Sequence, residues 1–139
     1  MKIIGAVLIV LSLVVAIAPM FTDCQSQGKA IVLENGKTVP MKCHWSGVAE
    51  LMVAVPLFVL GIMFLVNNNR MVFRNLSILG MILGIIIILI PTNLIGVCAN
   101  PEMICSSVMR PILILCGILV VVASSVGLWL SFKKQDQPV

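Results

Sequence analysis

Long apolar stretches alternate with short polar ones along the whole chain. Four of them reach the roughly 20 residues that a helix needs to cross the hydrocarbon core of a bilayer, and they cover residues 3–21, 47–66, 76–96 and 111–132. In lipid, a helix satisfies every backbone polar group within its own segment, so the many β-branched residues do not argue against helices here. The pattern predicts an all-α membrane protein, a single domain over residues 1–139 folded as an up-down bundle of four transmembrane helices.

Composition also indicates that lipid surrounds most of the chain. Hydrophobic residues make up 60% and charged residues 10% of the 139 residues, whereas a soluble domain is about half apolar and about a quarter charged. A chain this short has too much surface for its volume to bury so much apolar area away from water. The net charge of +4 is spread without a basic run and tyrosine is absent, so membrane lipid is a predicted partner and nucleic acid is not.

The positions of basic residues and cysteines predict the orientation. Four spans place both termini on one side with Arg70 and Arg74, and Lys133 and Lys134 directly follow the last span. Basic residues beside the spans favour the cytoplasm more strongly than those in a long loop such as 22–46. All cysteines outside the spans fall on the other side, where an oxidising compartment allows disulfides. We therefore expect a multi-pass protein of the prokaryotic inner cell membrane, with cytoplasmic termini and outer loops at 22–46 and 97–110.

The first outer loop has the pattern of a β-hairpin. Residues 29–33 are β-prone, residues 37–42 return, and Asn35-Gly36 between them is the strongest short hairpin signal. A small extracytoplasmic hairpin with a two-residue turn is therefore predicted.

The outer cysteines are predicted to form disulfides. One pair flanks the base of the hairpin and the other flanks the turn signal Asn100-Pro101; the four residues are Cys24, Cys43, Cys98 and Cys105. Bridges within each loop are the simplest connectivity, and bridges between the loops are the alternative.

Several residues near the outer ends of the spans are candidate ligands for a cofactor. His44 is the only histidine, and methionines are frequent on the same side. Imidazole with thioether suits Cu(I), and a His/Met pair suits haem iron, although methionine is also an ordinary packing residue. The candidate set is His44, Met41, Met103, Trp45 and Glu50, and the cofactor stays open between haem, copper and none.

Glu50 is the one acidic residue inside a predicted span. Ionisable residues at such positions are rare and suggest function by default. Arg110 opens the last span on the same side, so an interhelical Glu50–Arg110 ion pair is the structural interpretation, and a ligand or proton-handling role is the alternative.

Small residues mark the third and fourth spans. Gly80 and Gly84 form a Gly-x-x-x-Gly pattern, and Ser124, Ser125 and Gly127 form a second patch. Such residues let helix backbones approach closely, either within the bundle or against a helix of a partner.

Two motifs resemble a known family. The first is Cys43-His44-Trp45-Ser46 followed by Ala49-Glu50, and the second joins Asn100-Pro101, Met103 and Cys105 ahead of Pro111. Both resemble a small, largely uncharacterised prokaryotic family of four-span membrane proteins with a domain-of-unknown-function label. The resemblance implies the fold and no chemistry. It also implies an association with ABC-transporter components of the MacB-like permease type, near which members are encoded.

The function predicted first is that of a small non-catalytic accessory subunit of a larger membrane complex such as an ABC-type, MacB-like transporter. No phosphate-binding loop, zinc motif or nucleophile–base pair indicates an enzyme. One alternative is an outer-face protein that binds haem, a soft metal or a hydrophobic ligand through His44 and nearby methionines. The other is a quinone-linked thiol–disulfide oxidoreductase, although the Cys-x-x-Cys motif of such enzymes is absent.

Overall fold

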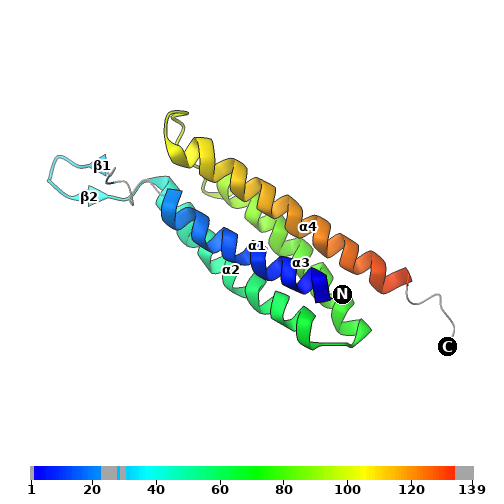
Figure 1. Cartoon of the computed structure of the whole chain (residues 1–139). Coiled ribbons are helices and arrows are strands. Elements are labelled where there is room, and N and C mark those ends of the chain that lie inside the picture. Colours follow the sequence, from blue (N-terminus) through cyan, green and yellow to red (C-terminus); the bar gives the residue numbers. More distant parts are fainter. Residues whose placement is uncertain (1, 23–27, 29–30, 134–139) are drawn as a thin grey trace.

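The computed structural model describes residues 2–22, 28 and 31–133 (Figure 1). It confirms the predicted fold class, four long helices with one small two-stranded sheet. The helices are α1 (Lys2–Thr22), α2 (Lys42–Val66), α3 (Arg70–Leu89) and α4 (Arg110–Lys133), and the strands are β1 (Ile31–Val32) and β2 (Thr38–Val39). Two π-helical turns adjoin the bundle: η1 (Ile90–Leu94) extends α3, and η2 (Cys105–Met109) leads into α4.

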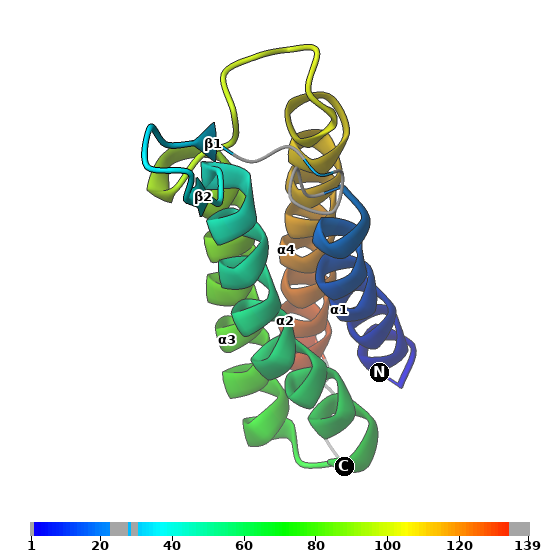
Figure 2. The same ribbon diagram turned by 90° about the vertical axis from the view of Figure 1, so that its left-hand side faces the viewer.

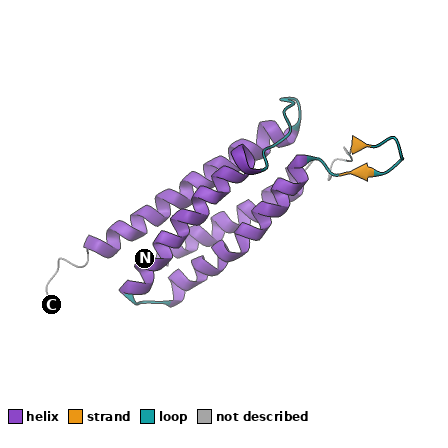
Figure 3. Cartoon of the chain, turned by 180° about the vertical axis from the view of Figure 1, so that it is seen from behind, coloured by secondary structure: helices purple, strands orange, loops and turns teal. Residues whose placement is uncertain are grey.

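The four helices form a closed ring in chain order. The most extensive packing joins α1 to α2 and α3 to α4, and smaller contacts of α2 with α3 and of α1 with α4 complete the ring. The first and last described residues lie at one end of the bundle with the short α2–α3 connection, and we call this the terminal end (Figures 1 and 2). The hairpin and the connection 95–104 lie at the opposite end, the hairpin end, and Figure 3 shows the strands projecting beyond the helices there.

The helices present apolar side chains outward and polar ones inward. Val10, Met52 and Leu115 are more than half exposed, at 60%, 72% and 62%. The buried polar residues are Ser12, Ser46, Glu50, Ser77, Ser124 and Ser131. A water-soluble bundle has the reverse arrangement, with its polar face outside. Four segments are long and apolar enough to cross a membrane, namely Lys2–Thr22, Lys42–Val66, Arg70–Leu94 and Cys105–Lys133. Together these features indicate a multi-pass membrane protein.

Two helical segments begin earlier than the apolar pattern predicts. Helix α2 starts at Lys42 and not at residue 47, so Cys43 and His44 lie in its first turn and not in a loop. Cys105 likewise begins η2, within the stretch predicted as the loop 97–110. The helices continue because backbone groups near the membrane surface still gain from internal hydrogen bonds after the apolar stretch has ended.

The hairpin forms with a different turn from the one predicted. Strands β1 and β2 pair antiparallel, with Ile31 opposite Val39. The Gly36 N–H donates to the Leu33 carbonyl at 2.9 Å, and the Leu33 N–H donates to the Lys37 carbonyl at 3.0 Å. Gly36 has φ of 72°, while no other type of residue in the described ranges has a positive φ. The connection is therefore a Leu33–Gly36 β-turn whose last residue is left-handed, and not a two-residue Asn35-Gly36 turn with two positive φ angles.

Glycines let α3 and α4 cross closely. A Cβ built on Gly117 would lie 3.0 Å from the Gly84 carbonyl oxygen, and one built on Gly84 would lie 3.1 Å from the Val121 backbone nitrogen. Ser124 packs against Gly80. Ser125 is exposed and donates to the Val121 carbonyl at 2.8 Å.

A second glycine crossing, which the sequence pattern did not predict, joins α1 to α2. A Cβ on Gly5 would lie 2.9 Å from the Gly61 carbonyl oxygen, and one on Gly61 would lie 3.1 Å from that of Gly5. Each of the two tightly packed helix pairs is thus held by a backbone approach that only glycine allows.

Replacing Gly117 with alanine should lower the stability of the bundle. The new methyl carbon would lie 2.5 Å from Ile88 Cγ1 and 3.0 Å from the backbone oxygen of Gly84, so the helices must separate. We expect the free energy of unfolding in detergent to fall by about 1–3 kcal/mol, the range for overpacked interiors. Leu115→Ala, on the outward face of α4, is the control and should change it far less. A Gly117→Ala variant as stable as the unmodified chain would contradict the close α3–α4 crossing.

Candidate metal centre

Three cysteines from separate parts of the chain meet at the hairpin end. Cys43 lies in the first turn of α2, Cys98 in the connection 95–104, and Cys105 at the start of η2. Their Sγ atoms all lie within 4.8 Å of one another, and those of Cys43 and Cys98, 55 residues apart, are separated by 3.5 Å. Cys43 and Cys105 are fully buried, whereas Cys98 is partly exposed. We call Cys43, Cys98 and Cys105 the thiol cluster.

A hydrogen bond between α2 and the end of η1 positions Cys98 beside Cys43. The Ser46 hydroxyl donates to the Gly96 carbonyl at 2.6 Å, and Ser46 lies three residues after Cys43, on the same face of α2. Gly96 has φ of 76°, which lets the chain leave the helix and turn back. Its N–H and that of Ile95 each donate to the Ile90 carbonyl at 3.1 Å, which closes the helix end.

The two π turns border the thiol cluster, and both occur at prolines. Pro91 lies within η1, and Pro111 follows η2 by two residues. Proline has no N–H and its ring crowds the carbonyl of the preceding turn, so a wider turn relieves the clash. At η2 the Arg110 N–H donates to the Cys105 carbonyl, five residues back. Cys105 therefore starts a widened turn, a local geometry that is frequent at functional sites.

A thioether adds a fourth sulfur. Met41 Sδ lies 4.0 Å from Cys98 Sγ. In a tetrahedral metal–thiolate site with bonds of about 2.3 Å, the sulfurs lie about 3.8 Å apart. The sulfur–sulfur distances of 3.5 Å and up to 4.8 Å in the cluster lie on either side of that value. Small side-chain movements would bring these sulfurs into coordination distance of one soft ion.

Glu50 lies below the cluster on the same face of α2. It follows Cys43 by seven residues, about two helical turns. The side chain is 0% exposed, and neither carboxylate oxygen accepts a hydrogen bond in the described part of the chain. A buried carboxylate without a hydrogen bond is costly unless a proton or a cation neutralises it.

The predicted Glu50–Arg110 ion pair is not formed in the structure. Glu50 is enclosed by the bundle, whereas Arg110 is exposed at the first turn of α4. An arginine at a helix end keeps its guanidinium hydrated by extending toward water, so it does not follow the carboxylate inward.

A family model described as a domain of unknown function, DUF4418, matches residues 3–130. The chain belongs to the DUF4418 family. That description assigns no chemistry to the DUF4418 chain. Comparisons with curated proteins and with solved structures found no significant match.

The other predicted ligands of the DUF4418 chain lie outside the thiol cluster. His44 lines a separate hollow of about 170 Å³ between α1 and α2, together with Pro19 and Met20. That volume is below the roughly 300–1,000 Å³ of typical ligand pockets, which argues against a haem there. Trp45 is 56% exposed and its ring lies edge-on to His44, with centroids 6.0 Å apart. Met103 packs against the buried core.

The disulfide predictions remain predictions. Cys24 lies outside the described residues, so its predicted bridge to Cys43 is not visible. The 3.5 Å between the sulfurs of Cys43 and Cys98 exceeds the bonded distance of about 2.05 Å. The structure brings Cys43 near both cysteines of the other loop, and it also brings Cys98 and Cys105 within 4.8 Å of each other, so it favours neither connectivity.

Replacing Glu50 with leucine should stabilise the protein. Leucine has a similar volume and removes a buried polar group that accepts no hydrogen bond from the described residues. We expect the free energy of unfolding in detergent to rise by about 1–3 kcal/mol. The exposed Glu102→Leu variant is the control and should leave it nearly unchanged. A destabilised Glu50→Leu variant would show instead that a bound cation or ligand satisfies the carboxylate in the purified protein.

Proposed function

We propose that this DUF4418 protein is a membrane protein that binds a thiophilic metal ion at its hairpin end, with Cu(I) as the preferred ion. The convergence of three cysteine thiols and the Met41 thioether, brought together from distant parts of the chain, carries the proposal. It develops the soft-metal alternative of the sequence analysis with a different ligand set. Cysteines replace His44, and Met41 is retained.

The donor set favours Cu(I). Among the described residues, the group that meets at this point consists of cysteines alone, without a carboxylate or imidazole. Thiolate and thioether ligands select soft ions such as Cu(I). Structural zinc sites usually have four Cys or His ligands, and the thioether of Met41 is a softer donor than either. If the hairpin end faces outward as the basic residues predict, the ion would be taken up on the outer side of the membrane.

The proposal predicts stoichiometric copper that depends on the cluster. The full chain, reduced in detergent under argon and then loaded with Cu(I), should retain about one ion per chain. Cys98→Ser should lose most of the copper and the ultraviolet thiolate-to-copper absorption, and Met41→Leu should weaken binding. Cys116→Ser is the matched control because this cysteine is also buried but lies six residues into α4, outside the thiol cluster. His44→Ala should bind as the unmodified chain does.

Two results would contradict the assignment. One is copper retention that is unchanged in both Cys98→Ser and Cys105→Ser, with helical circular dichroism preserved. The other is a preference for Zn(II) when both ions are supplied equally, which would reject Cu(I) as the preferred ion.

Thiol–disulfide exchange is the second candidate function, favoured by the 3.5 Å between Cys43 and Cys98. A short movement would bring these sulfurs to bonding distance, and Cys105 is close enough to attack the bond. Forming the bond releases two protons and two electrons, which a membrane quinone would accept. The role of accessory transporter subunit stays a prediction from the sequence, because no described contact is specific to it.

Differential alkylation tests the exchange candidate. Mass spectrometry across a redox titration should show a Cys43–Cys98 bridge that opens and closes between about −300 and −120 mV, the range of exchange-active proteins. A bridge that stays closed over this range would be structural. Thiols that remain reduced throughout while copper is bound would leave the metal-binding proposal as the better one.

A further inference from the structure

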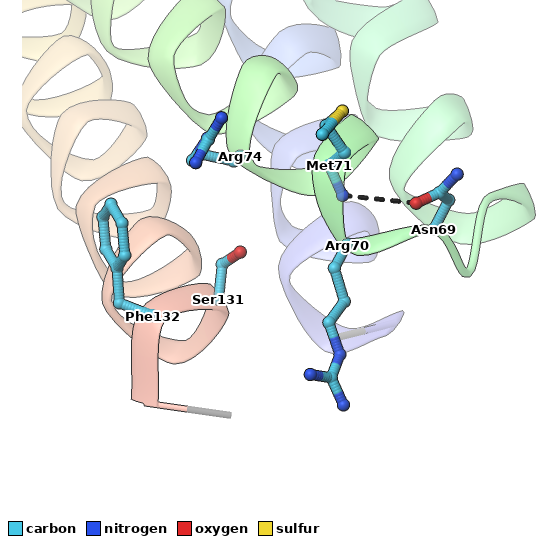
Figure 4. Close-up of a pocket in the computed structure, with 6 residues that line it drawn as sticks. All are labelled: Asn69, Arg70, Met71, Arg74, Ser131 and Phe132. Carbon is cyan, nitrogen blue, oxygen red and sulfur yellow. Dashed lines mark hydrogen bonds between the residues drawn. The ribbon is translucent and has the colours of Figure 1, made fainter. Parts of the chain in front are cut away.

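A second hollow lies at the terminal end of the bundle, far from the thiol cluster. It is about 310 Å³ in volume and lies between the start of α3 and the end of α4. Figure 4 shows Arg74 on the α3 side, Ser131 and Phe132 on the α4 side, and Arg70 extending away past the end of the bundle. The remaining lining residues are Asn69 and Met71.

The walls of this hollow combine a cation with apolar surface. Arg74 is exposed, and its guanidinium presents donors in the fork geometry that matches a phosphate group. Met71 and Phe132 are 67% and 49% exposed, so they offer apolar contact beside it. A phosphate attached to an acyl chain would contact both the guanidinium and the apolar side chains. Inorganic phosphate would contact the guanidinium alone.

The position of the hollow fits a lipid headgroup. Its residues lie where the candidate spans Arg70–Leu94 and Cys105–Lys133 end. These span ends lie at the level of the headgroups of one leaflet.

The charge of this end also favours an anion. The described ionisable residues at the terminal end are all basic, namely Lys2, Arg70, Arg74 and Lys133. The described acidic residues, Glu34, Glu50 and Glu102, belong to the other half of the molecule. Basic residues beside spans attract anionic lipids, and basic hollows between helices hold their headgroups.

We propose that the hollow between α3 and α4 binds an anionic phospholipid, with Arg74 on the phosphate and Phe132 and Met71 against the upper acyl chain. The proposal is independent of the metal site, because it uses residues at the opposite end of the bundle. The proposal concerns a specific site and not the general attraction of a basic surface. Removing the charge of Arg74 alone should therefore abolish the preference for anionic lipid.

Trp129 provides a local reporter for the test. It is 60% exposed and lies one turn before Phe132, and the Lys133 ammonium lies 5.0 Å from the centroid of its ring. The chain has two tryptophans, so a Trp45→Phe background leaves only this one.

The experiment compares two brominated lipids in phosphatidylcholine vesicles that hold the full chain. At equal mole fraction, brominated phosphatidylglycerol should quench Trp129 more than brominated phosphatidylcholine does, with about a fivefold preference in the fitted association constant. Arg74→Gln should reduce the preference to near unity. Arg110→Gln, at the hairpin end, is the matched control and should keep it.

Three results would overturn the proposal. Equal quenching by the two lipids would show that the hollow does not select anionic lipid. A preference that survives Arg74→Gln would place the attraction in the general basic surface. A preference abolished by millimolar inorganic phosphate at constant ionic strength would show that the hollow recognises the phosphate group alone and that contact of Met71 and Phe132 with the acyl chain adds nothing.

Discussion

Lipid offers no hydrogen bonds, and this constraint organises the whole molecule. Polar side chains must either turn inward or bond to their own helix. Both solutions occur: Ser12 and Thr92 donate to the carbonyls of Ile9 and Ile88, each at 2.7 Å, while Ser46 crosses to Gly96. The inward-facing polar groups are therefore concentrated between the helices. The candidate metal site lies beside one of them, Ser46, at the hairpin end.

The same constraint explains how the helices are held together. Apolar side chains gain little by leaving lipid for another apolar surface, so close packing must supply the stability. Gly84 with Gly117 and Gly5 with Gly61 allow this in the two helix pairs. Hydroxyl groups occupy the space beside other glycines, with Ser77 against Gly127. The Gly-x-x-x-Gly pattern of α3 was visible in the sequence, but Gly5 and Gly61 stand on different helices and form a pair only in the folded bundle.

The spans and the hairpin could be predicted from the sequence, because apolar length and turn residues are local signals. The thiol cluster could not. Spacing along the chain favours pairing within each loop, and only the left-handed Gly96 and the Ser46 hydrogen bond return Cys98 to α2. One readable signal was missed: Cys43, Ser46, Gly47 and Glu50 follow the i, i+3, i+4, i+7 pattern of one helix face. Beginning the predicted span at residue 47 hid that pattern, since it left Cys43 in the loop and outside the helix.

The position of the thiol cluster gives metal binding a structural consequence. The weaker contacts of the ring are those between the two helix pairs, α2 with α3 and α1 with α4. Cys43 belongs to the first pair, whereas Cys98 and Cys105 belong to the connection within the second. One ion held by all three sulfurs would therefore join the pairs at the hairpin end, where η1 already contacts α2 and η2 contacts α1. An ion that binds only the folded arrangement stabilises it by mass action. The thiol cluster thus lies where a single bound ion would add a link between the α1–α2 pair and the α3–α4 pair, whose mutual contacts are otherwise the smaller ones in the bundle.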